Sequence, residues 1–174
     1  LPLADQRKAI LPAPAGQRKV VLATNIAETS LTIEGIRLVV DSTQERVASF
    51  DPRTGLTRLL TQRISQASMV QRAGRAGRLE PGICLHLTSA EQAERAALQS
   101  TPEILQSDLS SLLLELLQWG CNDPSQLSWL DTPPAVNLAA ARRLLTQLGA
   151  LADERLTAKG QKMAALGNDP RLAA

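Results

Sequence analysis

One eight-residue segment brings together an amide, three guanidiniums and two glycines: Gln71-Arg72-Ala73-Gly74-Arg75-Ala76-Gly77-Arg78. Side chains three and four residues apart share one face of a helix, so a helix would align Gln71, Arg75 and Arg78. Each glycine costs a helix about 1 kcal/mol relative to alanine, so the pair suits close approach of another surface better than helix stability. Two positive charges beside a water-positioning amide suit a phosphoryl transition state. For the segment alone, the alternative is a solvated, arginine-rich helix end.

A second polar segment, residues 23–33 (ATNIAETSLTI), follows a run of apolar residues. That run, residues 19–24 (KVVLAT), predicts a strand that is buried on both faces of a parallel sheet. Hydroxyls and backbone N–H groups at the end of such a strand can bind a nucleotide or a nucleic-acid backbone. For these residues alone, the alternative is a helix start with Ser or Thr caps and Glu28 in the first turn.

The residues around both segments predict an α/β arrangement. Residues 37–41 (RLVVD) predict another buried strand, which ends in Asp41 at the sheet edge where ligands gather in open α/β folds. Further elements are expected as a helix at residues 65–78, a strand at 81–87 and a helix at 90–99.

A β-hairpin is expected at residues 44–62. The sequence DPRTG at its centre favours a turn, in which Gly55 can adopt a positive φ. Three arginines, Arg46, Arg53 and Arg58, are expected to point away from the apolar face of the hairpin.

Beyond Thr101 the sequence becomes helical. Leucines at the helical period predict an amphipathic helix over residues 103–120, which ends at Gly120. A second helix follows a double proline and ends at Gly149, and a third begins after Thr157, a suitable N-cap. Helices joined by a small turn at residues 152–156 predict a winged-helix-like module.

Composition excludes some classes of protein. The formal net charge is only +2, but residues 44–78 contain seven arginines and two carboxylates. Two distant cysteines and one histidine lack the spacing of a zinc site, so no metal ligands are expected in this chain. With no long apolar run and no signal peptide in the sequence, we expect no membrane association and a cytoplasmic location.

Taken in order, the two polar segments resemble motifs V and VI of superfamily 2 helicases, in the DEAH-box form. The likeness covers nearly the whole chain, and residues 1–42 resemble the bacterial HrpB-type branch. The implied fold class is α/β: a partial RecA-like parallel sheet with a β-hairpin insertion, followed by a small, mainly helical winged-helix-like domain. The implied domains are an incomplete second RecA-like domain at residues 1–100, a winged-helix-like domain at 101–157 and the start of a helical ratchet-like domain at 158–174.

The resemblance also implies roles for individual residues. Thr24 and Asn25 would contact the RNA backbone. Gln71 would face the γ-phosphate and the attacking water, and Arg75 and Arg78 would be arginine fingers. The nucleotide-binding residues would be Thr32, Glu34, Gln71, Arg75 and Arg78, with Glu34 standing where an Asp is common in the family.

The sequence contains neither a G-x-x-x-x-G-K-[ST] phosphate loop nor a D-E-x-H motif. We therefore expect a fragment of an ATP-dependent RNA helicase that is inactive alone. ATP and Mg²⁺ would be bound mainly by an N-terminal RecA-like lobe of the same protein, and the partner would be RNA or DNA. Two alternatives without ATPase activity remain: a stand-alone nucleic-acid-binding module that uses the hairpin arginines and the winged helix, and a leucine-rich partner-docking domain.

Overall fold

The computed structural model describes residues 2–29 and 33–174. The chain divides into two compact units. The sheet unit comprises Leu1–Arg46 and Thr61–Ser100, and the helical unit comprises Val47–Leu60 and Thr101–Ala174. This mixed α/β organisation confirms the fold class expected from the sequence.

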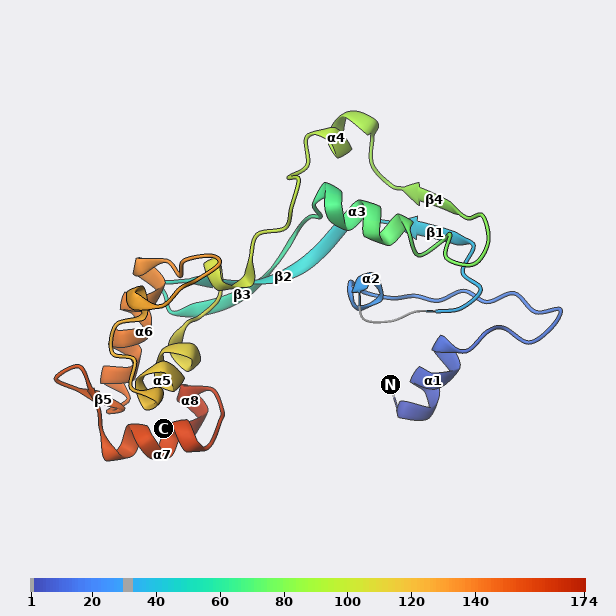
Figure 1. The fold of residues 1–174 in the computed structure, drawn as a ribbon. Coiled ribbons are helices and arrows are strands. Elements are labelled where there is room, and N and C mark those ends of the chain that lie inside the picture. The colour runs from blue at the N-terminus through green and yellow to red at the C-terminus, as the bar shows by residue number, and fades with distance from the viewer. Residues whose placement is uncertain (1, 30–32) are drawn as a thin grey trace. The chain divides into compact units, whose positions relative to one another are not determined.

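Two parallel strands form the centre of the sheet unit. β1 (Leu38–Asp41) pairs with β4 (Ile83–His86), and Asp41 lies opposite His86 at the carboxyl end of both strands. α3 (Gln66–Ala73) packs on β1 and β4, and α2 (Ile26–Thr29) packs on α3 (Figure 1). The unit also contains α1 (Leu3–Ile10) and α4 (Ala90–Glu94). The strands expected at residues 37–41 and 81–87 are therefore confirmed, whereas α4 is shorter than expected.

The strand expected at residues 19–24 is not formed, and this prediction is wrong. The side chains of Val20 and Leu22 are 87% and 94% exposed. The parallel sheet of the described residues contains only β1 and β4, and neither pairs with this run. An apolar run becomes a buried strand only where neighbours bond its backbone and cover its faces. The same lack of cover leaves four strand side chains more than half exposed: Leu38, Val40, Ile83 and Leu85.

The predicted hairpin is confirmed. β2 (Gln44–Asp51) pairs with β3 (Leu56–Arg63), and Gly55 in the turn has φ +69°. The N–H of Gly55 donates to the carbonyl oxygen of Asp51 at 2.8 Å. Phe50 is buried, whereas β3 is exposed along its whole length. The three hairpin arginines are exposed, as expected: Arg46, Arg53 and Arg58.

The helical unit contains a leucine-rich core. Its main helices are α5 (Ser110–Trp119), α6 (Ala135–Gln147) and α7 (Ala158–Ala165), with the short α8 (Pro170–Ala173) packed on α5 and α7. Two 3₁₀ turns, η1 (Glu103–Leu105) and η2 (Pro124–Gln126), precede α5 and α6. The buried core cluster comprises Leu109, Leu113, Leu114, Leu117, Ala141, Leu145, Ala150, Leu151 and Met163.

Helix ends in this unit follow the expected capping residues. Gly120 ends α5 with φ +96°, and the Thr157 hydroxyl accepts the N–H of Gly160 at the start of α7. β5 (Leu151–Ala152) and β6 (Arg155–Leu156) form the small antiparallel turn between α6 and α7. The helix expected over residues 103–120 starts only at Ser110, because η1 and a turn precede it.

In the part of the chain that the structure describes, no helix combines the length and the apolar character needed to span a bilayer. The domain boundaries expected after residues 100 and 157 stay predictions.

Candidate functional site

The glycine-arginine segment begins on a helix and leaves it. The Ser65 hydroxyl accepts the N–H of Ser68 and caps α3, and the helix ends at Ala73, with Gly74 as its C-cap. Turn bonds follow, in which the N–H of Arg75 donates to the carbonyl of Arg72 at 3.1 Å. The helix expected through residue 78 is therefore wrong, because glycine favours leaving a helix. Gln71 lies on α3, whereas Arg75 and Arg78 lie in the turns after it.

Arg72 fixes this segment to two neighbouring elements. Its Nε lies 2.9 Å from Glu28 Oε2 on α2, and its Nη1 lies 2.9 Å from Asp41 Oδ1 at the end of β1. The side chains of Arg72, Glu28 and Asp41 are only 14%, 13% and 2% exposed. Burial disfavours the charge of Arg72, but its hydrogen bonds to Glu28 and Asp41 outweigh burial and raise its pKa above the usual value.

Asp41 is the centre of the buried polar cluster. Its Oδ1 also accepts the N–H of Thr43 at 3.0 Å, and its Oδ2 lies 3.2 Å from Nδ1 of His86 on β4. Nε2 of His86 lies 3.8 Å from the Cys84 sulfur. Burial, together with the Asp41 charge, raises the pKa of the Cys84 thiol. The sequence placed Asp41 at the ligand-binding edge, but in the structure this carboxylate is engaged by neighbours in the same unit.

Arg75 also contacts α2. Its Nη2 donates to the carbonyl oxygen of Glu28, and the side chain is partly buried. Gln71 and Arg78 are exposed. The sequence argument for a shared helix face missed Arg72 and Glu28. The sequence did contain a signal for this pair: Arg72 is a third arginine within residues 71–78, and Glu28 is a carboxylate within residues 23–33.

Gly82 packs closely against the backbone of the glycine-arginine segment. A Cβ added to Gly82 would overlap the backbone carbonyl of Ala76, and Ala76 is 2% exposed. The backbone between Arg75 and Arg78 therefore packs directly on the residue before β4. By contrast, a Cβ on Gly77 would meet atoms no nearer than 4.0 Å. Within the described residues, packing therefore requires glycine at position 82 but not at position 77.

The polar segment at residues 23–33 contacts the glycine-arginine segment through α2. The carbonyl oxygens of Thr24 and Asn25 accept the N–H groups of Ala27 and Glu28 at 3.2 and 2.9 Å, and so start α2. Both side chains are exposed. Glu34 lies in an exposed turn before β1. Thr32 lies outside the described residues.

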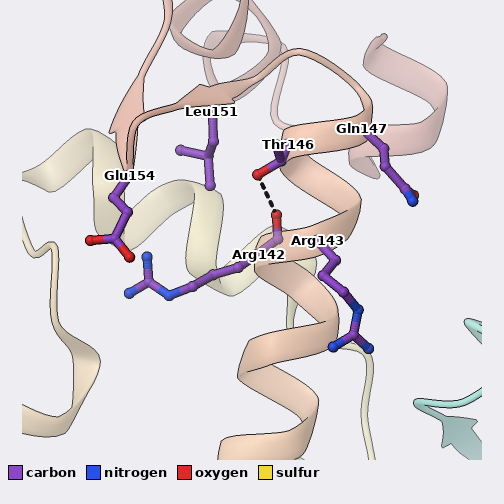
Figure 2. Close-up of a pocket in the computed structure, with 6 residues that line it drawn as sticks. All are labelled: Arg142, Arg143, Thr146, Gln147, Leu151 and Glu154. Atoms are coloured by element: carbon purple, nitrogen blue, oxygen red, sulfur yellow. Dashed lines mark hydrogen bonds between the residues drawn. The ribbon is translucent and has the colours of Figure 1, made fainter.

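The helical unit has a hollow between α6 and the β5–β6 turn (Figure 2). Its lining residues are Arg142, Arg143, Thr146, Gln147, Leu151 and Glu154. Figure 2 shows the Arg142 and Arg143 guanidiniums pointing in different directions. Nη2 of Arg142 donates to the carbonyl of Asn122 at 2.7 Å. The two cations therefore do not converge on one anion. No group of three or more metal-ligating side chains occurs among residues 2–29 and 33–174.

Comparison with known proteins places this geometry in a family. Residues 2–80 match the helicase conserved C-terminal domain, and residues 141–167 match the winged-helix helicase-associated domain HA2. The chain is 82% identical over its full length to the ATP-dependent RNA helicase HrpB of Escherichia coli, of which it covers 22%. A crystal structure described as Escherichia coli DEAH/RHA helicase HrpB matches 99% of the chain with a TM-score of 0.96. The chain belongs to the HrpB-type DEAH-box helicases.

A more distant relative matches the same stretch. Over 99% of its length the chain is 45% identical to a pre-mRNA-splicing factor ATP-dependent RNA helicase of Schizosaccharomyces pombe, of which it covers 15%. It also covers 22% of the chain in the Escherichia coli HrpB crystal structure. The chain is thus the helicase C-terminal region of an HrpB homologue and spans less than a quarter of these relatives.

Proposed function

We propose that this region supplies the arginine side of the ATP-hydrolysis site in an ATP-dependent RNA helicase. The proposal is supported by the relatives, which are named ATP-dependent RNA helicases and match over the whole chain. RNA is the proposed substrate, with DNA as the competing one. We also propose that an N-terminal RecA-like lobe of the same protein faces this region, and that the protein is cytoplasmic.

The side chains after α3 fit an anionic phosphate group. Arg75 and Arg78 carry fixed positive charge, and Gln71 presents an amide from an exposed position on α3. ATP with Mg²⁺, when bound, supplies the γ-phosphoryl group and the metal that neutralises it. Because the described residues contain no cluster of metal ligands, the Mg²⁺ ligands are assigned to the other lobe.

Each side chain has a distinct role in the proposal. Gln71 orients the attacking water, and Arg75 and Arg78 stabilise the charge that develops on the transferred group. Thr32 and Glu34 are assigned to nucleotide contacts. Partial burial of Arg75 against Glu28 favours a defined guanidinium position before the nucleotide arrives.

Thr24 and Asn25 are assigned to the RNA backbone. Their exposed side chains precede α2, and α2 carries Glu28, the carboxylate bound by Arg72. A change in the position of the arginine segment therefore has a direct route to the RNA-binding residues. Contacts of this type fix the position of a strand and carry no sequence preference.

The observation that carries the proposal is that Arg72 anchors the segment that contains Arg75 and Arg78. Arg72 is bound by two carboxylates, which neutralise it and fix the backbone. Arg75, three residues later, donates through Nη2 to the backbone carbonyl of Glu28 on α2. A segment whose backbone is fixed by Arg72 gives Arg75 a defined position, and this suits the binding of an anionic phosphate group.

The test is Arg75→Ala in the full-length protein. We expect ATP turnover to fall by about 10³ or more, because an arginine finger contributes about 10³–10⁵ to such rates. RNA affinity should stay within about twofold, because Arg75 is not assigned to the RNA backbone. Steady-state phosphate release and RNA titration measure the two quantities.

Arg95→Ala is the matched control. Arg95, the C-cap of α4, is also in the sheet unit, but its side chain is 78% exposed and pairs with Glu91 on α4. Its loss should leave turnover unchanged. Undiminished turnover in Arg75→Ala would refute the assignment, and an equal loss in Arg95→Ala would show that the effect is not specific to the site.

The stand-alone binding module is favoured by one observation, the exposure of Arg46, Arg53 and Arg58 on the hairpin. It predicts tight, salt-dependent RNA binding by the 174-residue chain alone. The helicase proposal predicts that the chain alone binds RNA weakly and that tight binding requires the full-length protein. Titration of both with the same labelled RNA distinguishes the two functions.

A further inference from the structure

The tip of the hairpin is held within the helical unit. The N–H of Phe50 donates to the carbonyl of Gln106 at 2.9 Å, and the Phe50 side chain is only 8% exposed. These contacts fix β2 near its end. The turn itself, which includes Gly55 at φ +69°, receives a separate contact from the last helix of the chain.

That contact is made by Arg171 on α8. Its Nη2 donates to the carbonyl of Gly55 at 3.3 Å, although the two residues are 116 positions apart. The same Nη2 lies 2.8 Å from Asp108 Oδ2, and Nη1 lies 3.6 Å from Asp169 Oδ2. Asp108 is itself held in place, because its Oδ1 accepts the N–H of Ser110 at the start of α5.

The geometry favours a positional role for Arg171. The Arg171 and Asp108 side chains are 36% and 18% exposed, and partly exposed pairs of this kind contribute little stability. The planar guanidinium can bind the carboxylates and the carbonyl together, because its donors point in fixed directions. The carboxylates therefore aim the guanidinium at the hairpin turn.

The guanidiniums of the hairpin arginines remain accessible to solvent. The Arg53 side chain is 90% exposed, with its Nε 3.5 Å from Asp51 Oδ1, and Arg58 on β3 is also exposed. Arg171, by contrast, is less exposed and contacts two carboxylates. Fixing the turn thus fixes the backbone that carries two cations able to meet phosphates.

We propose that Arg171 is a positioning residue for nucleic-acid binding: by holding the Gly55 carbonyl, it fixes the hairpin tip on the helical unit and sets where Arg53 and Arg58 meet the RNA backbone. The RNA part rests on the proposed function. The positional part depends only on contacts within the helical unit.

The experiment uses the full-length protein with Arg171→Gln, which removes the charge and keeps a polar side chain. Amide hydrogen exchange without ATP or RNA should become about fivefold faster at residues 50–56, while α5 stays protected. RNA affinity should weaken about fivefold, because the phosphate-binding arginines lose their fixed position. Arg155→Gln, an exposed arginine on β6, is the control and should change neither quantity.

Two further variants separate positioning from general destabilisation. Arg171→Lys should restore part of the hairpin protection, because charge returns without the planar fork. Asp108→Asn should resemble Arg171→Gln, and the double variant should be no worse than either single one, because the pair acts as a unit.

Unchanged exchange at residues 50–56 in Arg171→Gln would overturn the proposal. An exchange rate in the double variant that equals the product of the two single effects would also overturn it. A third contrary result is faster exchange in α5 of Arg171→Gln together with no recovery of hairpin protection in Arg171→Lys. Faster hairpin exchange with unchanged RNA affinity would overturn the RNA part alone. If the proposed helicase function is wrong, the unsubstituted protein will show no ATP turnover. The exchange measurement is made without ATP or RNA, so its result does not depend on that function.

Discussion

The two units of this chain are stabilised by different interactions. In the helical unit, nine buried apolar residues from α5, α6, α7 and the segments beside them form one core. In the sheet unit, three charged side chains at the candidate site are largely removed from solvent: Arg72, Glu28 and Asp41. Four apolar side chains on β1 and β4, by contrast, are more than half exposed: Leu38, Val40, Ile83 and Leu85.

This difference shows that one kind of interaction stabilises the helical unit and another kind positions side chains in the sheet unit. Apolar burial is non-directional and holds helices together without aiming particular atoms. Charge-assisted hydrogen bonds have defined directions and fix a guanidinium relative to its neighbours. In the sheet unit, such directional bonds from Arg72 to Glu28 and Asp41 fix the position of the arginine segment.

The largest expected effect is in the leucine core. Leu113 is fully buried, so Leu113→Ala should lower the free energy of unfolding by about 3–4 kcal/mol through lost burial and a new cavity. Denaturant unfolding, followed by circular dichroism, measures it. Leu130→Ala is the matched control, because Leu130 is fully exposed and its loss should cost less than about 0.5 kcal/mol. Equal losses would contradict the assigned core.

The next effect should come from the buried carboxylate. Asp41→Asn keeps the shape but removes the charge that faces Arg72, and should cost about 2–3 kcal/mol, as for hydrogen bonds to charged groups. Asp5→Asn is the control, since Asp5 forms an exposed pair with Lys8. If both substitutions change the unfolding free energy alike, the directional network is not what stabilises the sheet unit.

Gly82→Ala sharpens the comparison at the backbone. Because its Cβ would overlap the Ala76 carbonyl, the substitution should destabilise the chain by about 1–2 kcal/mol. Gly77→Ala, where the added Cβ has room, should leave the melting temperature nearly unchanged. The opposite ranking of the two melting temperatures would show that the arginine segment does not pack on Gly82.

The smallest effect concerns the Cys84 thiol beside this network. Burial raises its pKa above the usual 9.0, so its reactive thiolate should form at higher pH in the folded chain than in the unfolded one. The stability gained from the neutral thiol is complete below the unfolded pKa and is lost as pH rises through the folded pKa. Alkylation rates against pH, read at the Cys84 peptide by mass spectrometry, test this. A lower midpoint in the folded chain would contradict it.

Much of the fold could be predicted from local patterns. Ser65, Gly120 and Thr157 lie at helix ends as their capping preferences predict, and Gly55 takes the positive φ that the hairpin turn requires. Residues 19–24 show the limit of such patterns. Their apolar run fits a buried strand, but burial depends on neighbouring strands that the run itself does not specify.

The site was predicted in part, for a similar reason. Helix periodicity placed Gln71, Arg75 and Arg78 on one face, but the chain leaves the helix at Gly74. Spacing along one helix also could not reveal that Arg72 pairs with Glu28 and Asp41, which are 44 and 31 residues away. The roles of Gln71, Arg75 and Arg78 in hydrolysis stay predictions.

The most direct test compares Arg72→Ala with Arg75→Ala in the full-length protein, with ATP turnover and melting temperature measured on the same samples. If Arg72 anchors the segment and Arg75 acts on the nucleotide, Arg72→Ala lowers the melting temperature, whereas Arg75→Ala keeps it and loses turnover by about 10³. A protein with Arg75→Ala that hydrolyses ATP at the unsubstituted rate, or that loses activity only because it unfolds, would contradict this division of roles.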